Sequence, residues 1–263
     1  GLKVVEANKT ILSRRGMFSG SDEARIEMLQ SILDCNKVKA IFFARGGYGS
    51  IRIIDKLNFS LFINNPKWLI GFSDITVFLS HISKNYNFPT LHSPMPFNFP
   101  KTSRKSLKEI FNLLFGIKNK IKIISNKNNR EGNAKGNLIG GNLSILCSLL
   151  SSNSFPKTKG NILLIEDVGE YLYSIDRMIY SLKRSGVFKS ITALIVGKFS
   201  KIKDNKPAFG QNINQIITQA LSEYKFPICF DFPVGHVKNN LPVILNTKVE
   251  LKVNNFVELI YVK

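Results

Sequence analysis

Apolar runs of strand length alternate with helix-like segments through the first half of the chain. The runs lie at 39–44, 68–72 and 90–92. Apolar side chains recur at helical spacing after Ser21 and again after Ser73. Ser21 is suited to cap its helix, because a serine hydroxyl accepts a hydrogen bond from an N–H group of the first turn. Strands that alternate with helices are typical of βαβ units, so this half is predicted to be an α/β fold on a parallel sheet.

The second half shows the same alternation and ends in a strand-like tail. Asn142 follows two glycines and is suited to cap a helix that carries Leu143 and Leu146. Further strands are predicted at 161–165, 193–196 and 228–232, and further helices at 174–183 and 213–224. In the tail, apolar and polar residues alternate on both sides of Asn254-Asn255, which predicts a β-hairpin.

A change in composition separates the two halves. Residues 116–136 are basic, rich in asparagine and without clear periodicity, which predicts a linker. We therefore expect an N-terminal domain over 1–115 and a C-terminal domain over 137–263. At 263 residues, of which 44% are hydrophobic, the chain is long enough to bury one large core or two smaller ones.

The chain is strongly basic. Its 37 lysines and arginines exceed its 18 aspartates and glutamates, which gives a net charge of +19. Such an excess raises nucleic acid as a partner. The lysines are scattered, however, and the densest run, 118–130, lacks the interleaved aromatic side chains that stack on bases. We therefore expect no nucleic-acid partner.

Other features of the composition favour a cytoplasmic protein. No window approaches the about 18 to 20 consecutive apolar residues of a membrane span, and the stretch from Gly1 to Glu6 lacks the apolar core of a secretory signal. The three cysteines, Cys35, Cys147 and Cys229, form no CxxC or Cys/His ligand spacing. They therefore indicate neither a disulfide framework nor a zinc site, and a reducing compartment is expected.

Ser73 lies where an apolar strand ends and a helix begins. A strand-to-helix turn of this kind exposes a serine hydroxyl at the carboxyl end of a sheet and brings N–H groups of the next helix beside it. Such N–H groups can stabilise an oxyanion. A serine nucleophile also needs a base and a carboxylate that orients the base, and the histidines and acids elsewhere in the chain are the candidates for these roles.

The chain has three histidines, and their positions differ. His81 lies inside the helix after Ser73, where a packing or surface role is expected. His92 ends a predicted strand just before Pro94, which favours a structural or substrate-lining role. His236 follows a strand end and Gly235, and a histidine on such a loop is well placed to meet the serine.

Glu166 is the candidate for the orienting carboxylate. It follows the predicted strand 161–165 directly, at a carboxyl end. Asp167 and Glu170 are its neighbours, and the simpler interpretation is a solvated acidic loop or acids at the next helix N-terminus, where they are favoured in any case. Spacing alone leaves these alternatives open.

The segment Arg45-Gly46-Gly47-Tyr48-Gly49-Ser50 is a glycine-rich loop between a strand and a helix. It matches neither GxGxxG nor a P-loop. Its glycines would let backbone N–H groups approach an oxyanion over Ser73. Arg45 is suited to a substrate carboxylate, because a guanidinium matches that group with two hydrogen bonds.

Together, these motifs closely resemble the LD-carboxypeptidases, the muramoyltetrapeptide carboxypeptidase family of serine peptidases. The matching blocks are Arg45–Ser50, Gly71–Thr76, His92 with Pro94-Met95, Gly140–Leu143, Glu166-Asp167 with Asp176–Met178, and Gly235-His236. They occur in the family's order across nearly the whole chain, which makes the match specific.

The resemblance implies a Ser-His-Glu triad at the junction of an N-terminal Rossmann-like parallel-sheet domain and a C-terminal β-rich α/β domain. The implied triad is Ser73, His236 and Glu166; the oxyanion donors are the N–H groups of Gly47 and Asp74; and the substrate-binding candidates are Arg45, Tyr48, His92 and Arg177. The implied reaction removes the terminal D-alanine from murein tetrapeptide during cytoplasmic cell-wall recycling. A homodimer without a metal or other cofactor is implied as well.

Two other functions remain open, and the chain departs from the family pattern in places. A microcin-immunity-type hydrolase shares the motifs but cleaves aminoacyl nucleotide conjugates, and an inactive relative would only bind muropeptides. Family members usually begin with a strand and helix ahead of this chain's start, so we expect that unit to be missing from the sheet. Ser93 replaces a commoner glycine, and Ser151-Ser152 stands where Gly-Thr is typical.

Overall fold

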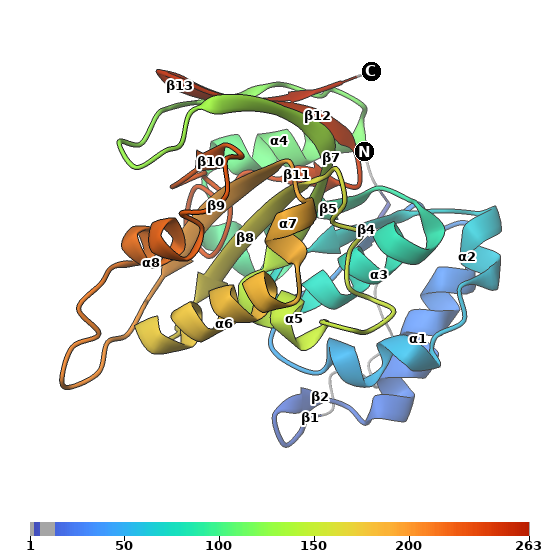
Figure 1. The fold of residues 1–263 in the computed structure, drawn as a ribbon. Helices are drawn as coiled ribbons and strands as arrows, with labels where there is room; N and C mark the ends of the chain where they lie inside the picture. The colour runs from blue at the N-terminus through green and yellow to red at the C-terminus, as the bar shows by residue number, and fades with distance from the viewer. Residues whose placement is uncertain (1–2, 6–13, 263) are drawn as a thin grey trace.

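The computed structural model describes residues 3–5 and 14–262. These residues form two main sheets with helices packed around and between them (Figure 1). A short hairpin of β1 (Arg14–Arg15) and β2 (Phe18–Ser19) precedes them. The stretch from Gly1 to Glu6, in which we expect no secretory signal, lies partly outside the described residues.

The N-terminal half builds a four-stranded sheet in the order β11-β5-β4-β3. Its strands are β3 (Ala40–Phe42), β4 (Trp68–Gly71), β5 (Thr90–His92) and β11 (Val243–Leu245). The first three are parallel, as predicted, whereas β11 comes from the C-terminal half and pairs antiparallel with β5. The helices of this half are α1 (Asp22–Asp34), α2 (Ser60–Asn64), α3 (Thr76–Tyr86) and α4 (Arg104–Leu114). Alternate strand residues face opposite layers: Leu69 packs with α3, and Ile70 packs with α4.

The C-terminal half builds a seven-stranded sheet in the order β10-β9-β8-β7-β12-β13-β6. The strands are β6 (Ile121–Ile124), β7 (Gly132–Asn142), β8 (Ile162–Val168), β9 (Ala193–Ser200), β10 (Ile228–Cys229), β12 (Lys248–Val253) and β13 (Phe256–Tyr261). The strands from β7 to β10 are parallel, and the rest are antiparallel. One face is covered by α5 (Leu143–Ser148), α6 (Leu172–Arg184), α7 (Val187–Ser190) and α8 (Ile213–Ala220). The predicted α/β fold class and the terminal β-hairpin are confirmed.

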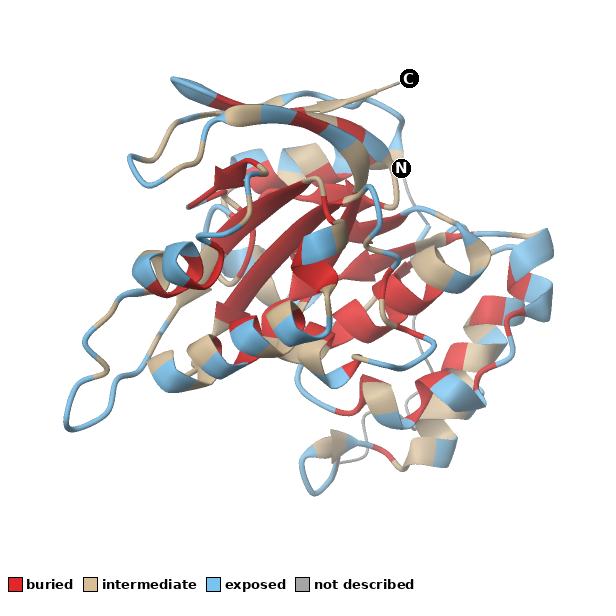
Figure 2. Ribbon diagram, in the orientation of Figure 1, coloured by how far each residue is buried: buried red, intermediate tan, exposed pale blue. Residues whose placement is uncertain are grey.

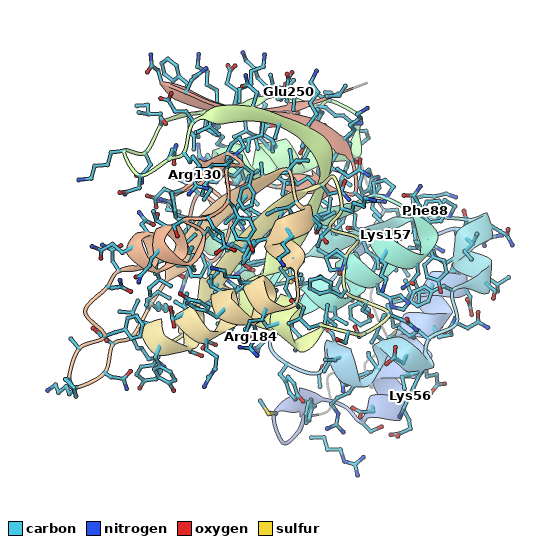
Figure 3. The ribbon with its side chains drawn as sticks, in the orientation of Figure 1. Lys56, Phe88, Arg130, Lys157, Arg184 and Glu250 are labelled. Carbon is cyan, nitrogen blue, oxygen red and sulfur yellow. The ribbon has the colours of Figure 1, made fainter. Side chains whose placement is uncertain are left out.

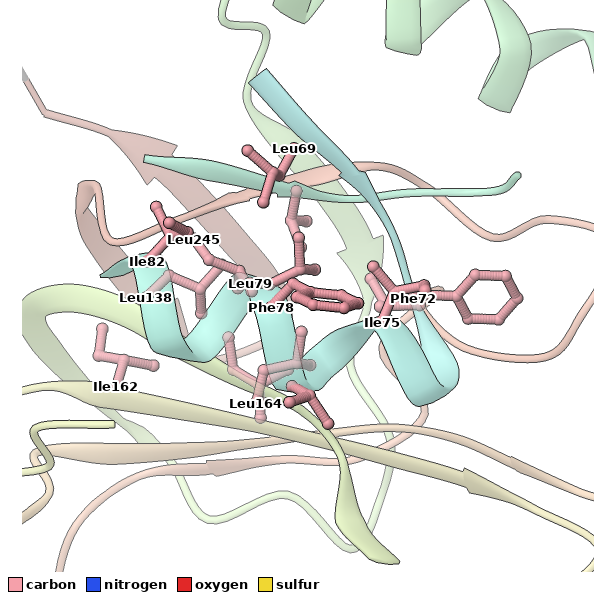
Figure 4. Close-up of a cluster of buried hydrophobic side chains, with 14 of the residues drawn as sticks. Leu69, Phe72, Ile75, Phe78, Leu79, Ile82, Leu138, Ile162, Leu164 and Leu245 are labelled. Atoms are coloured by element: carbon pink, nitrogen blue, oxygen red, sulfur yellow. The ribbon is translucent and has the colours of Figure 1, made fainter. Parts of the chain in front are cut away.

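Helix α3 lies between the two sheets. Figure 4 shows Leu69 of the four-stranded sheet on one side of the helix and Ile162 and Leu164 of the seven-stranded sheet on the other. Strands β4, β5, β8 and β9 and this helix form the buried centre of the molecule (Figure 2). Every residue of α3 from Thr76 to Ile82 is buried. The segment that follows Ser73 is therefore fixed by both halves of the chain.

Two segments differ from the sequence-based expectations. The segment 116–136, expected as a linker, contains β6 and the start of β7 and so belongs to the larger sheet. Apolar and polar residues alternate over only a few positions here, and Ile121 and Ile123 are only half-buried. The segment is therefore a strand because it pairs with β13. The expected acidic loop after residue 165 is also wrong at its start, because β8 continues through Glu166 to Val168 on β9, past a bulge.

Exposed basic side chains occur on several parts of the surface. The exposed Lys56, Lys157 and Arg184 project from separate parts of the molecule (Figure 3). Within the described ranges, no helix is both long enough and apolar enough to cross a bilayer.

Candidate active site

Ser73 is held on a tight turn at the carboxyl end of β4. Its φ of 62° is in the left-handed region that residues other than glycine rarely occupy. A 3₁₀ turn over Ser73–Ile75 then leads into α3. A Cβ on Gly71 would lie 2.8 Å from Cγ2 of Ile75, so only glycine lets the chain fold back this closely. The half-buried Ser73 therefore occupies the strand-to-helix turn that the sequence predicts. This turn, from Gly71 to Ile75, is called the elbow below.

The glycine-rich loop is tied to this elbow through Asp74. Oδ2 of the buried Asp74 carboxylate accepts hydrogen bonds from the N–H of Ser50 at 3.0 Å and from its hydroxyl at 2.7 Å. Gly46 lies directly against the serine, since a Cβ added there would be 3.0 Å from Cβ and 3.1 Å from Oγ of Ser73. Gly47 has a φ of 126°, which favours glycine. The loop that contains Gly47 thus lies beside the candidate nucleophile.

An arginine network holds the loop from its other side. Nη1 of Arg25 donates to the carbonyl oxygen of Gly49 at 3.2 Å. Both Arg25 and Arg52 also hydrogen-bond to Asp22, and these bonds, the one from Arg52 first, hold the pKa of that carboxyl below its usual range. The exposed Tyr48 ring lies 5.9 Å from the Phe18 ring. Residues of the β2–α1 region therefore restrain the loop.

Glu166 and His236 meet at the carboxyl end of the larger sheet. Nδ1 of His236 lies 2.8 Å from Oε2 of Glu166, which is completely buried. Gly235, with a φ of 128°, makes this approach possible, because a Cβ there would be 3.0 Å from Oε2 of Glu166. The His236 ring also packs on Phe72, with 4.6 Å between centroids. Since Phe72 directly precedes Ser73, the histidine reaches the elbow.

The electrostatic setting keeps Glu166 ionised. Burial by itself raises the pKa of the carboxyl, but the hydrogen bond from His236 and the proximity of His92 outweigh burial and lower the pKa to about 2. Glu166 is therefore a carboxylate at neutral pH. An ionised acceptor on Nδ1 favours the His236 tautomer in which Nε2 is free to take a proton.

The neighbouring Asp167 has a different task. Its carboxylate accepts hydrogen bonds from the side chain of Asn142 at 3.0 Å and from the N–H of Ser144 at 2.9 Å. The N–H of Asn142 in turn donates to Oγ1 of Thr76 at 3.2 Å, which links the larger sheet to α3. Burial raises the pKa of Asp167 to about 6. Of the neighbouring acids, Glu166 is thus the one that contacts His236, and Asp167 supports the junction.

The other two histidines are buried. Nδ1 of His81 lies 2.9 Å from Oγ of Ser154, and its ring packs on Phe59 in the core, as the packing interpretation predicts. His92 has no exposed surface, and its Nε2 lies 3.9 Å from Oε1 of Glu166. Its position supports the structural role expected for it more than a substrate-lining one.

The two candidate arginines are both exposed but differ in their surroundings. The Arg45 guanidinium lies 5.3 Å from the centre of the Phe97 ring, on the loop that touches Ser73. The Arg177 guanidinium lies 5.4 Å from the centre of the Tyr173 ring on α6 and donates to Oγ of Ser174 at 3.3 Å. The roles of Phe72 and Ser50 could not be predicted from the sequence, because only the fold brings Phe72 to His236 and Ser50 to Asp74.

Comparison with known proteins assigns both halves to one family. Residues 1–93 match the family model of the LD-carboxypeptidase N-terminal domain, and residues 135–251 match that of the C-terminal domain. A Bacillus subtilis protein described as a probable murein peptide carboxypeptidase is 29% identical over 254 residues, 94% of this chain and 79% of that protein.

Solved structures give the same result for the fold. The crystal structure of muramoyltetrapeptide carboxypeptidase from Oxalobacter formigenes aligns with a TM-score of 0.86 at 27% identity, covering 95% of this chain and 88% of that one. The microcin C7 self-immunity protein MccF aligns with a TM-score of 0.84 at 21% identity, covering 94% and 82%. At that identity the second similarity shows a shared fold.

Proposed function

This chain belongs to the LD-carboxypeptidase family, and on that premise we propose that it removes the terminal D-alanine from murein tetrapeptide by a Ser-His-Glu mechanism. The observation that carries the proposal is the 2.8 Å contact between His236 and the buried Glu166. The packing of His236 on Phe72, next to the strained Ser73, supports it further. We also propose that the protein works as a cytoplasmic homodimer, as the family resemblance implies.

In the proposed acylation step, His236 is the base. Its Nδ1–H donates to Glu166, so Nε2 accepts the proton of Ser73 as Oγ attacks the carbonyl carbon of the peptide bond to D-alanine. The carbonyl oxygen becomes an oxyanion, for which the N–H groups of Gly47 and Asp74 are the proposed donors. The intermediate collapses, the C–N bond breaks, and His236 passes its proton to the departing D-alanine nitrogen.

Deacylation repeats these steps with water. His236 removes a proton from a water molecule as the water oxygen attacks the carbonyl carbon of the acyl-enzyme. The bond to Oγ of Ser73 then breaks, and His236 returns the proton to the serine. The products are free D-alanine and the shortened peptide, and the enzyme returns to its starting state.

A carboxypeptidase must also recognise a free carboxylate. Arg45 is the better candidate for this role, because its loop contacts Ser73 through Gly46, whereas the Arg177 guanidinium is engaged with Tyr173 and Ser174. A guanidinium binds a carboxylate through two parallel hydrogen bonds. Tyr48, exposed on the same loop, is proposed to line the substrate path.

The variant Ser73→Ala tests the proposed nucleophile. It should lower D-alanine release from murein tetrapeptide by on the order of 1,000-fold or more, because no covalent intermediate can form. Thermal unfolding should change little, since alanine removes one hydroxyl from a half-buried position. Full activity in this variant would show that the nucleophile is assigned wrongly.

The similarity to MccF supports one further candidate function, hydrolysis of aminoacyl nucleotide conjugates. An assay that offers murein tetrapeptide and an aspartyl sulfamoyl adenosine, a compound seen bound to MccF, would decide between the two. Labelling of Ser73 by a fluorophosphonate would argue against the remaining alternative, an inactive relative that only binds muropeptides.

A further inference from the structure

We propose that His92 is a positioning residue that holds the Glu166 carboxylate from the side opposite His236. This inference rests on the proposed Ser-His-Glu mechanism. Oε2 of Glu166 is paired with His236, whereas Oε1 has no hydrogen-bond partner among the described residues. A completely buried carboxylate with one unpaired oxygen is costly, so its surroundings should supply a second donor.

His92 is the group that faces this unpaired oxygen. The His92 side chain is completely buried, and neither ring nitrogen has a hydrogen-bond partner within the described part of the chain. Its Nε2 lies 3.9 Å from Oε1 of Glu166, about 1 Å beyond an ordinary hydrogen bond. Two unsatisfied buried groups of complementary chemistry therefore lie next to each other.

The backbone fixes the position of His92. In β5 it lies between Gly71 of β4 and Val243 of β11, with which it is in register. Its ring lies 5.7 Å from the Phe72 ring, which also contacts His236. The sheet that carries Ser73 thus reaches the catalytic carboxylate of the other sheet through His92.

This arrangement has a consequence for the proposed base. With a proton on Nε2, the His92 N–H dipole is directed toward Oε1 and restrains rotation of the carboxylate, so that Oε2 stays on Nδ1 of His236. His236 then keeps its Nε2 toward the serine. Because the buried His92 ring does not reach solvent, its loss should affect kcat rather than KM.

The experiment compares His92→Leu, which removes both ring nitrogens, with His92→Gln, which keeps an N–H donor. Two quantities are measured: the rate at which a fluorophosphonate labels Ser73 across the pH range of histidine titration, and kcat and KM for D-alanine release. In His92→Leu, the labelling rate and kcat should fall on the order of 10- to 100-fold with little change in KM. His92→Gln should recover most of the loss.

The pH profile of labelling separates a positioning role from a merely structural one. The titratable groups around Glu166 are His92 from β5, His236 from the loop after β10, and Asp167 beside it in β8. Without His92, the full carboxylate charge acts on His236, so the midpoint of the profile should move to higher pH. An unchanged midpoint together with a wild-type rate in His92→Leu would overturn the proposal.

His81→Leu is the matched control, because it removes another buried histidine from the same half of the chain. It should keep the wild-type labelling rate. Equal losses in both leucine variants, in parallel with thermal stability, would contradict a specific role for His92, as would a rise in KM alone.

The wild-type chain separates this proposal from the proposed function. If it is labelled but releases no D-alanine, the proposed substrate is wrong, while the labelling rates of the variants still test the role of His92. A wild-type chain that is not labelled would overturn both.

Discussion

The elbow around Ser73 and the Glu166–His236 pair lie at one site but are built in different ways. The elbow depends on neighbours in the sequence, since Gly71 leaves room for Ile75 and Ser73 itself takes the strained φ. Glu166 and His236 are 70 positions apart and meet through the larger sheet. There the loop before His236 is anchored on β9, where the N–H of Lys198 donates to the carbonyl oxygen of Val234 at 2.7 Å.

This difference has a consequence for substitutions. A local turn can be recognised and disturbed through a few adjacent residues, whereas the acid–base pair depends on strand register and on the close approach of Gly235. We therefore expect changes at the pair to remove function without touching the nucleophile, and changes at the elbow to act through small displacements of Ser73.

The largest effect is expected at the pair. Glu166→Gln keeps the shape of the side chain but removes the charge that orients His236, so D-alanine release should fall on the order of 1,000- to 10,000-fold. Steady-state kinetics measures this loss. Glu170→Gln, a nearby acid outside the proposed triad, is the control and should retain activity; similar losses in both variants would contradict the assignment of the acid.

A smaller effect is expected at the elbow. Gly46→Ala would place a Cβ 3.0 Å from Cβ and 3.1 Å from Oγ of Ser73, closer than such atoms normally approach, so the serine must shift by a few tenths of an ångström. A displaced nucleophile should lower the fluorophosphonate labelling rate on the order of 10- to 100-fold with the pH midpoint unchanged. A shifted midpoint would instead show that the two regions are coupled.

The last effect concerns stability rather than activity, at the junction between the regions. Asp167 has a pKa of about 6 in the folded state against the ordinary 3.8, so the stability it contributes is present below about pH 4 and is lost as pH rises to about 6. Asp167→Asn should remove this fall, at about 1.4 kcal/mol for each pKa unit. Urea unfolding from pH 4 to pH 7, the window set by those two pKa values, measures it.

Glu166 supplies the opposite case for the same measurement. Its pKa is about 2 against the ordinary 4.5, so the stability it contributes is present above about pH 4.5 and is lost as pH falls toward 2. Glu166→Gln should therefore remove the loss in the more acidic window. It should also weaken the fall between pH 4 and pH 6, because the Glu166 charge contributes to the raised pKa of Asp167. If Asp167→Asn kept the wild-type slope between pH 4 and pH 6, the raised pKa of Asp167 could not be the cause of that slope.

Several features of the site were predictable because they are local. The positions of the elbow, the glycine loop and the Asn142 cap follow from glycine, capping residues and apolar spacing within short windows. The α/β class followed from the alternation of strands and helices. The strand β6 was not predictable, because Ile121 and Ile123 are embedded in lysine and asparagine and become a strand only by pairing with β13.

Local sequence patterns were enough to identify the candidate residues: a serine on a strand-to-helix turn, a histidine after a glycine, and a set of acids after a strand. The packed fold was needed to show that Glu166 is the acid that contacts His236 and that His92 lies near Glu166. It also showed that Asp167 bonds to Asn142, whose N–H links the larger sheet to α3. The physical reason is that hydrogen bonding and burial depend on distances in space. Those distances are set by sheet register and by the packing of α3 between two sheets, and short sequence patterns carry no record of either.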